Sequence, residues 1–174
     1  VDKLLDPADA SRLLTPQGVP FRWPGESRNI AFTSLWDNFP ARVSIPVGRR
    51  AEAAYFLVAG STNVMQNRIA NAVLRLRYAD GVEHSLELVP PFNFWNLSPI
   101  RHRSGAPGQN LRPDYTDPVD AFAVPKPWPE RVQLGENCRA ILLNRRLRPD
   151  AVLESVTLET LSPKWSSASW DSPF

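Results

Sequence analysis

Aromatic, amide, carboxylate and guanidinium side chains gather in three short segments of the sequence. They are Trp36-Asp37-Asn38, residues 63–68, and a stretch that runs from Phe94-Trp95-Asn96 to Arg101-His102-Arg103. An aromatic ring packs on the apolar face of a pyranose, while planar polar groups bridge the hydroxyls of the sugar. These residue types therefore predict a sugar-binding site. Its candidate contacts are Trp36, Asp37, Asn38, Asn63, Gln66, Asn67, Arg68, Trp95, Asn96 and Arg101.

The same side chains also have a structural interpretation. Trp36 and Trp95 can cap the core beneath the loops, and Asp37 with Asn38 can form an Asx turn. The run Arg101-His102-Arg103 can be a solvated cluster of charge. Sugar contact and structural support both stay open from the sequence alone.

Catalysis and metal binding have weaker signals. His84 falls on an apolar strand face opposite Leu76, and His102 has no evident partner. No GxSxG elbow, HExxH helix or glycine-rich phosphate loop is present. Asp37 has no evident second carboxylate in the same loops, although glycoside hydrolysis needs a pair. An acidic DxDxD cluster is also absent, so we expect no catalytic residue, metal ion or cofactor.

The elements that must position these segments have the patterns of short strands. Residues 30–35 are apolar and β-prone, and residues 41–47 alternate between apolar and polar side chains. Pro46 cannot donate a ladder hydrogen bond, which predicts that its strand lies at a sheet edge. Residues 53–59 are apolar throughout, which predicts a strand covered on both faces. Turns are expected at 36–40 and 47–50.

The clearest local structure is a β-hairpin around an Asp-Gly pair. A two-residue loop would set apolar residues opposite polar ones. A three-residue loop at 79–81 instead sets Leu74 opposite Leu86, and it also pairs Arg77 with Glu83. Matching of the apolar faces therefore predicts the longer loop, with its glycine in a left-handed conformation.

Further strands are predicted at residues 121–124, 138–143 and 153–161, with a basic turn at 144–150. The total is about eight to ten short antiparallel strands without a strong helix. This pattern predicts an all-β fold, a β-sandwich.

A chain of 174 residues, 43% of them hydrophobic, is most simply one domain. Residues 13–162 are predicted to form it. Residues 1–12 are interpreted as a linker or edge segment with a short helical turn at 6–10, and residues 163–174 as a tail or linker.

Strand parity brings the three polar segments together. If successive strands cross the sandwich in alternating directions, the loops at 36–40 and 60–71 and the segment after Val89 lie at one end. The turns at 48–52 and 79–81 lie at the other end. We therefore expect the sugar-binding residues at the first end.

Five stretches of the sequence resemble a galactose-binding-like jelly-roll domain. They are GVPF, FTSLWDNFP, AGSTNVMQNRI, YADGVEHSLEL and LESVTLETLS, and the resemblance spans roughly residues 18–162. More narrowly, they are similar to an uncharacterised accessory module found with bacterial glycoside hydrolases, often in Bacteroidetes-type proteins that degrade polysaccharides. The resemblance implies a jelly-roll sandwich, an extracellular or periplasmic location, and a polysaccharide or oligosaccharide partner. It also allows a covalently linked glycoside hydrolase domain.

The end of the chain departs from this family. In such domains an apolar strand usually follows the LETLS motif and closes the sandwich, whereas residues 164–174 contain no apolar run. Three interpretations stay open: the closing strand is missing, the N-terminal residues replace it, or the tail leads elsewhere.

Composition excludes several other classes of protein. The net charge is only +2, and lysines and arginines are scattered rather than gathered in a stripe, so we expect no nucleic-acid partner. The sequence contains no run of about 18 apolar residues, so no membrane span is predicted. No signal peptide is visible. The single cysteine, Cys138, excludes an internal disulfide and a CxxC zinc site, and we expect a buried, inert thiol.

Three functions follow from the sequence. The first is a non-catalytic carbohydrate-binding or carbohydrate-associated module that binds glycan weakly. The second is a structural sandwich that packs against a catalytic domain through an exposed apolar patch and has no ligand of its own. The third is a jelly-roll polysaccharide lyase or hydrolase, which would need an arginine, histidine or tyrosine beside Asp37 in an open cleft.

Overall fold

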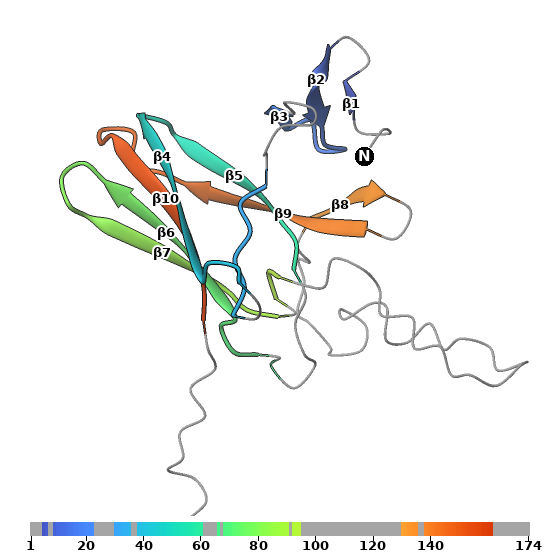
Figure 1. Ribbon diagram of the computed structural model, residues 1–174. Helices are drawn as coiled ribbons and strands as arrows, with labels where there is room; N and C mark the ends of the chain where they lie inside the picture. The colour runs from blue at the N-terminus through green and yellow to red at the C-terminus, as the bar shows by residue number, and fades with distance from the viewer. Residues whose placement is uncertain are drawn as a thin grey trace, which may run out of the picture.

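The computed structural model describes residues 5–6, 9–22, 30–35, 38–60, 66, 68–90, 92–94, 130–135 and 138–161. These residues form ten β-strands and no α-helix, so the chain is all-β as predicted (Figure 1). The strands are β1 (Leu5–Asp6), β2 (Asp9–Leu14), β3 (Pro20–Arg22), β4 (Arg42–Arg49), β5 (Ala53–Val58), β6 (Ala72–Tyr78), β7 (Glu83–Leu88), β8 (Glu130–Gly135), β9 (Cys138–Arg146) and β10 (Leu153–Thr160).

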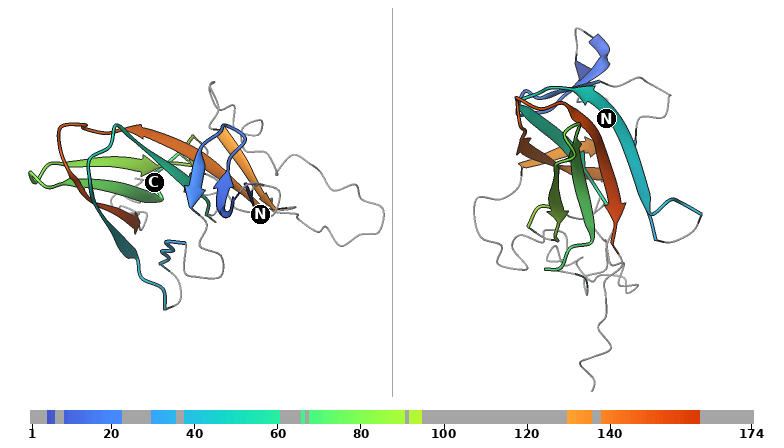
Figure 2. Two further views of the ribbon diagram at one scale, coloured as in Figure 1. Left: turned by 90° about the horizontal axis from the view of Figure 1, so that it is seen from above. Right: turned by 90° about the vertical axis from the view of Figure 1, so that its left-hand side faces the viewer.

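The strands form three antiparallel sheets. The four-stranded sheet has the order β4-β10-β6-β7, and the three-stranded sheets have the orders β5-β9-β8 and β1-β2-β3. The first two sheets face each other as a β-sandwich, and the N-terminal sheet lies against β5 and β9 (Figure 2). The pairing is nested, because β4 pairs with β10 and the next strand, β5, pairs with β9.

The core of the sandwich is built by side chains that point inward from the two larger sheets. Leu74 on β6 and Leu143 on β9 belong to one buried cluster, which also contains Phe94. Leu76 and Tyr78 form a second cluster near the opposite end of the sheets, and neither side chain is exposed. Period-two alternation on β6 explains this arrangement, since alternate side chains of a strand face the same side.

Strand β9 is covered on both faces. Ile141 packs against the four-stranded sheet, while the neighbouring Leu142 packs with Leu13 of the N-terminal sheet and Val132 of β8. The continuous apolar run of this strand predicted its burial correctly. The strand is longer than predicted, however, because it continues through residues 144–146 before the chain turns.

The hairpin prediction is confirmed in detail. Leu74 lies opposite Leu86 and Arg77 opposite Glu83. In the three-residue loop, Tyr78 donates its backbone N–H to the carbonyl of Val82 and accepts a hydrogen bond from the N–H of Gly81, which has a φ of 86°. The ion pair is different from the expected one, because the guanidinium of Arg77 contacts Glu154 of β10 instead of Glu83. Strand β10 lies next to β6 on its other side, so it supplies a competing carboxylate.

The prediction of an edge strand around Pro46 is confirmed for the described part of the chain, in which β4 pairs with β10 and with no other strand. The predicted strand at 30–35 is wrong. Ser34 donates its backbone N–H to Pro40, within the following turn, and the side chains of Ile30 and Phe32 are 75% and 52% exposed. High β-propensity did not make a strand here because no ladder pairs with this segment.

Two other predictions need correction. The prediction that β5 is covered on both faces is confirmed only in part, because Phe56 packs in the core of the sandwich and Leu57 against the N-terminal sheet, whereas Tyr55 is 44% exposed. Residues 9–10 belong to β2 rather than to a helical turn. The predicted strand at 121–124 lies outside the described residues, as does the side chain of Cys138.

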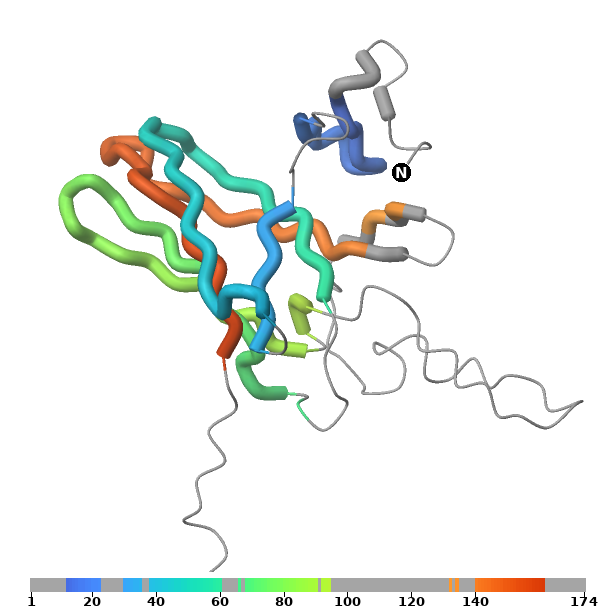
Figure 3. The backbone as a smooth tube through the Cα atoms, in the orientation of Figure 1, coloured from blue at the N-terminus to red at the C-terminus, as the bar shows by residue number. Residues whose placement is uncertain are grey.

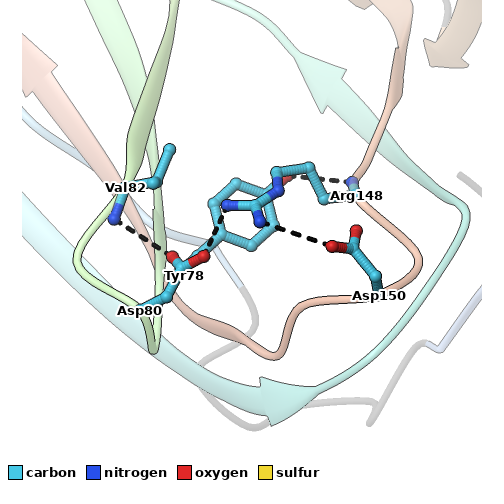
Figure 4. A network of polar contacts seen from close by, with 5 residues as sticks. All are labelled: Tyr78, Asp80, Val82, Arg148 and Asp150. Carbon is cyan, nitrogen blue, oxygen red and sulfur yellow. Dashed lines mark hydrogen bonds and ion pairs between the residues drawn. The ribbon is translucent and has the colours of Figure 1, made fainter.

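A polar clamp closes the end of the sandwich that carries the hairpin turn (Figure 4). The guanidinium of Arg148 lies 5.3 Å from the ring centroid of Tyr78, 2.7 Å from a carboxylate oxygen of Asp80 and 3.4 Å from one of Asp150. Asp80 also accepts a hydrogen bond from the backbone N–H of Val82. That bond, followed by the one from Arg148, lowers the pKa of Asp80.

The burial of Leu76 makes it a test of the core. Leu76→Ala should lower the free energy of unfolding by about 2–5 kcal/mol, because it leaves a cavity between the sheets. Leu35→Ala makes the same chemical change at a side chain that is 44% exposed, and should change the free energy by about 0.5 kcal/mol or less. Urea denaturation followed by circular dichroism measures both, and equal losses would contradict this placement of the core.

The clamp predicts how stability depends on pH. The pKa of Asp80 is lower in the folded chain, so its carboxylate stabilises the fold above the ordinary aspartate pKa of about 4. This contribution is lost as the pH falls through the lowered folded pKa. Asp80→Asn should therefore destabilise the protein more at pH 7 than at pH 2, measured by urea denaturation at both pH values. If the two losses are equal, the charge of Asp80 contributes nothing.

Candidate functional site

The segments that were expected to meet at one end of the sandwich do so in their described parts. At the end of β10, Thr160 donates its backbone N–H to the carbonyl of Ala41, and its hydroxyl lies 2.6 Å from that of Thr33. The next residue, Leu161, donates its N–H to the carbonyl of Asn71. Figure 3 shows residues 38–41 and 68–71 close to this strand end. We call this region the loop end.

The segment after β7 joins the same region. Asn71 donates its backbone N–H to Leu88, and Arg68 donates its own to Pro90 at 2.6 Å. The ring of Phe94 packs directly over Gly60. The clamp of Arg148 and Asp80 lies at the opposite end, with the hairpin turn. The strand-parity prediction is therefore confirmed for the described residues.

Asn71 organises the loop that contains Gln66 and Arg68. Its side-chain amide donates hydrogen bonds to the carbonyls of Gln66 and Ile69, at 2.9 and 3.0 Å. The side-chain amide thus supplies hydrogen-bond donors to backbone carbonyls in the turn. Sequence reasoning missed this role of Asn71, although an asparagine just before a strand is a common signal of such a turn.

Asn93 has the same role in the segment after β7. Its side-chain oxygen accepts a hydrogen bond from the N–H of Val89 at 2.7 Å, and its amide donates one to the carbonyl of Glu87 at 2.8 Å. These bonds turn the chain sharply where the strand ends. Both loops of this end are therefore held by asparagine amides that contact the backbone.

Arg68 has an unusual backbone conformation. Its φ of 63° is the one positive value at a non-glycine position among the residues that the structure describes. A left-handed conformation costs an L-residue about 1–2 kcal/mol. The hydrogen bond to Pro90 and the frame around Asn71 hold the backbone in this conformation.

The structure describes three of the ten predicted contact residues. Asn38 and Arg68 are exposed at the loop end, and Gln66 is half-buried in the loop that Asn71 holds. The other seven stay predictions because they lie outside the described residues: Trp36, Asp37, Asn63, Asn67, Trp95, Asn96 and Arg101.

Exposed apolar side chains concentrate in residues 30–45, before and within edge strand β4. Ile30, Phe32, Leu35, Phe39 and Ile45 are each 44–75% exposed. The rings of Phe32 and Phe39 meet edge to face with centroids 4.7 Å apart. We call these five residues the apolar segment. Sequence reasoning missed their exposure because it took the first three as part of a β-strand.

Groups suited to catalysis or to metal binding are not gathered in the described part of the chain. His84 lies opposite Leu76, as predicted, and its ring meets that of Tyr78 edge to face at 5.4 Å. No group of three or more histidine, cysteine, aspartate or glutamate side chains there could hold a metal ion. The described residues also include no helix with the length and hydropathy needed to cross a membrane.

Comparison of the chain with models of known families, with curated proteins and with solved structures finds no match. The resemblance to a galactose-binding-like domain therefore stays a prediction that rests on the quoted motifs. The arrangement of the loop end has to support any functional proposal by itself.

The contact between Gly60 and Phe94 can be tested directly. A Cβ added at Gly60 would lie 2.3 Å from the tip of the Phe94 ring, which is buried in the core and cannot move without repacking. Gly60→Ala should therefore lower the free energy of unfolding by about 1–3 kcal/mol. The cost should shrink in a Phe94→Leu background, measured as a double-mutant cycle. An equal loss of unfolding free energy in both backgrounds would show that Gly60→Ala does not act through the ring of Phe94.

Proposed function

We propose that this chain is a non-catalytic carbohydrate-binding module whose sandwich presents its contact residues at the loop end. The observation that carries the proposal is the convergence of three chain segments on one hydrogen-bonded frame. The end of β10 joins residues 33 and 41 to Asn71, and Asn71 joins them to the end of β7. The backbones of the three segments are thereby held close to one another in space.

The exposed side chains at this end suit a sugar. Phe39 offers an aromatic ring, the adjacent Asn38 offers an amide, and Arg68 offers a planar guanidinium. Ring and hydroxyl contacts of this kind are few in such modules, and micromolar to millimolar binding needs only about 4–8 kcal/mol. Trp36 and Trp95, which lie outside the described residues, are proposed to enlarge the aromatic surface.

The finer fold that we propose is a jelly roll of the galactose-binding-like class. Its support is the nested pairing of the strands. In one sheet β4 pairs with β10, and in the other the next strand along the chain, β5, pairs with β9, the strand before β10. A jelly roll is also built from two antiparallel sheets of short strands. An extracellular or periplasmic location and a linked glycoside hydrolase domain belong to the same proposal.

The apolar segment favours a second function. Five large apolar side chains exposed within sixteen residues of sequence are typical of a surface that another protein covers. A structural module that packs against a neighbouring catalytic domain would bury them. This function needs no glycan, so a binding screen separates it from the first.

The screen is affinity electrophoresis of the chain in gels that contain plant or microbial polysaccharides. We expect retardation by at least one polymer, and a loss of retardation in Trp36→Ala, Trp95→Ala or Phe39→Ala. Tyr55→Ala is the matched control, because Tyr55 is an exposed ring on β5, away from the loop end. Circular dichroism should show that each variant is folded.

Retardation that persists in all three loop-end variants would place the sugar elsewhere on the molecule. Failure of the unchanged chain to bind any polymer would overturn the carbohydrate proposal. In that case the apolar segment would become the better indication of function.

A further inference from the structure

We propose that residues 30–35 bind the same segment of a second copy of this chain, as an antiparallel pair of strands around a two-fold axis. This interaction goes beyond the proposed carbohydrate-binding function and does not depend on it. It follows from the way in which the segment presents its side chains and its backbone.

The large apolar side chains of this segment face away from the protein. Ile30 and Phe32 are 75% and 52% exposed, whereas the smaller Ala31 and Thr33, which alternate with them, are half-buried. A strand that packs on the core of its own chain shows the reverse pattern, with its large apolar side chains inward. The exposed face of residues 30–35 is therefore suited to a surface outside the chain.

The backbone of the segment is unpaired within the described chain. Among the residues that the structure describes, no hydrogen bond reaches a backbone N–H or C=O group of residues 30–33. The next residue, Ser34, donates its N–H to Pro40, and the hydroxyl of Thr33 attaches the segment to Thr160 of β10. A β-prone segment with unpaired backbone groups can add to a strand of another chain.

Matching of the faces selects a second copy as that other chain. In an antiparallel pair centred on Phe32, this residue lies opposite its own copy, and Ala31 lies opposite Thr33. The exposed side chains of both copies then share one face, and the half-buried ones share the other. A shift of one residue would set the exposed Phe32 opposite a half-buried residue. The segment is thus complementary to itself, as a two-fold dimer requires.

Charge and size both allow this contact. Residues 30–36 carry no charged side chain, although charges are a common means by which proteins prevent pairing of this kind. Ile30, Phe32 and Leu35, with the ring of Phe39 that packs against Phe32, expose about 400 Å² of side-chain surface. Two copies would bury about 800 Å², which is typical of a weak, reversible contact. The Phe39 ring is then shared with the sugar contact proposed above.

The experiment measures the mass of the full chain by sedimentation velocity, from about 1 μM to about 1 mM. We expect the average mass to rise from 19.5 kDa towards twice this value. Phe32→Glu and Phe32→Arg, each alone, should raise the dissociation constant of the dimer at least about 10-fold, because like charges then face each other across the axis. An equimolar mixture of the two variants should restore the dimer, because opposite charges then meet.

Two further variants control the experiment. Tyr55→Glu places a charge on an exposed ring of β5 and should dimerise like the unchanged chain. Ile30→Glu changes a side chain that is 75% exposed, and should weaken the dimer without unfolding the protein. It therefore keeps the proposal testable if either charge at position 32 prevents folding, which circular dichroism would reveal.

The inference fails if the unchanged chain stays monomeric over the whole range, and the apolar segment then remains available to a neighbouring domain. A dimer that persists in Phe32→Glu and Ile30→Glu would place the interface elsewhere. Loss of the dimer in both charged variants without recovery in their mixture would contradict the pairing of residue 32 with its own copy. Masses above that of a dimer would contradict closed two-fold pairing. None of these results bears on whether the chain binds glycan.

Discussion

The insertion of β10 between β4 and β6 is the constraint on which the rest of the structure depends. Leu158 lies opposite Val43 on one side and Leu74 on the other, so three strands far apart in sequence align their inward side chains in one row. Without β10, neither neighbour could complete its ladder or bury its apolar face. The end of the same strand also provides Thr160 and Leu161, which tie the loop segments together.

The two ends of the sandwich are stabilised in different ways. At the hairpin end, charged side chains bond to one another, and Arg148 covers the buried ring of Tyr78. At the loop end, asparagine amides bond to backbone carbonyls, as Asn71 and Asn93 do. The first arrangement pairs Arg148 with Asp80 and Asp150. The second holds the backbone and leaves side chains such as that of Asn38 exposed, which is what a binding surface requires.

The apolar segment and Pro46 lie along or next to β4, which is an edge strand of the sandwich. An open edge strand invites pairing with another chain, and a proline such as Pro46 interrupts that pairing because it lacks an N–H. The apolar side chains before β4 therefore present a surface without presenting a regular ladder. Such a surface suits contact through side chains, with an aromatic partner ring, a sugar face or a packed neighbouring domain.

The sequence by itself determined the local features: the hairpin register with its left-handed glycine, the edge position of Pro46, and the strands β9 and β10. Each depends on a pattern within a few residues: the alternation of apolar and polar side chains, the residue types of a turn, or the absence of a backbone N–H at proline. Only the tertiary structure decided that residues 30–35 lie outside any sheet, that Arg77 pairs with Glu154, and that the backbone of Arg68 is strained. These outcomes depend on which distant strand lies alongside, and short-range patterns carry no information about that neighbour.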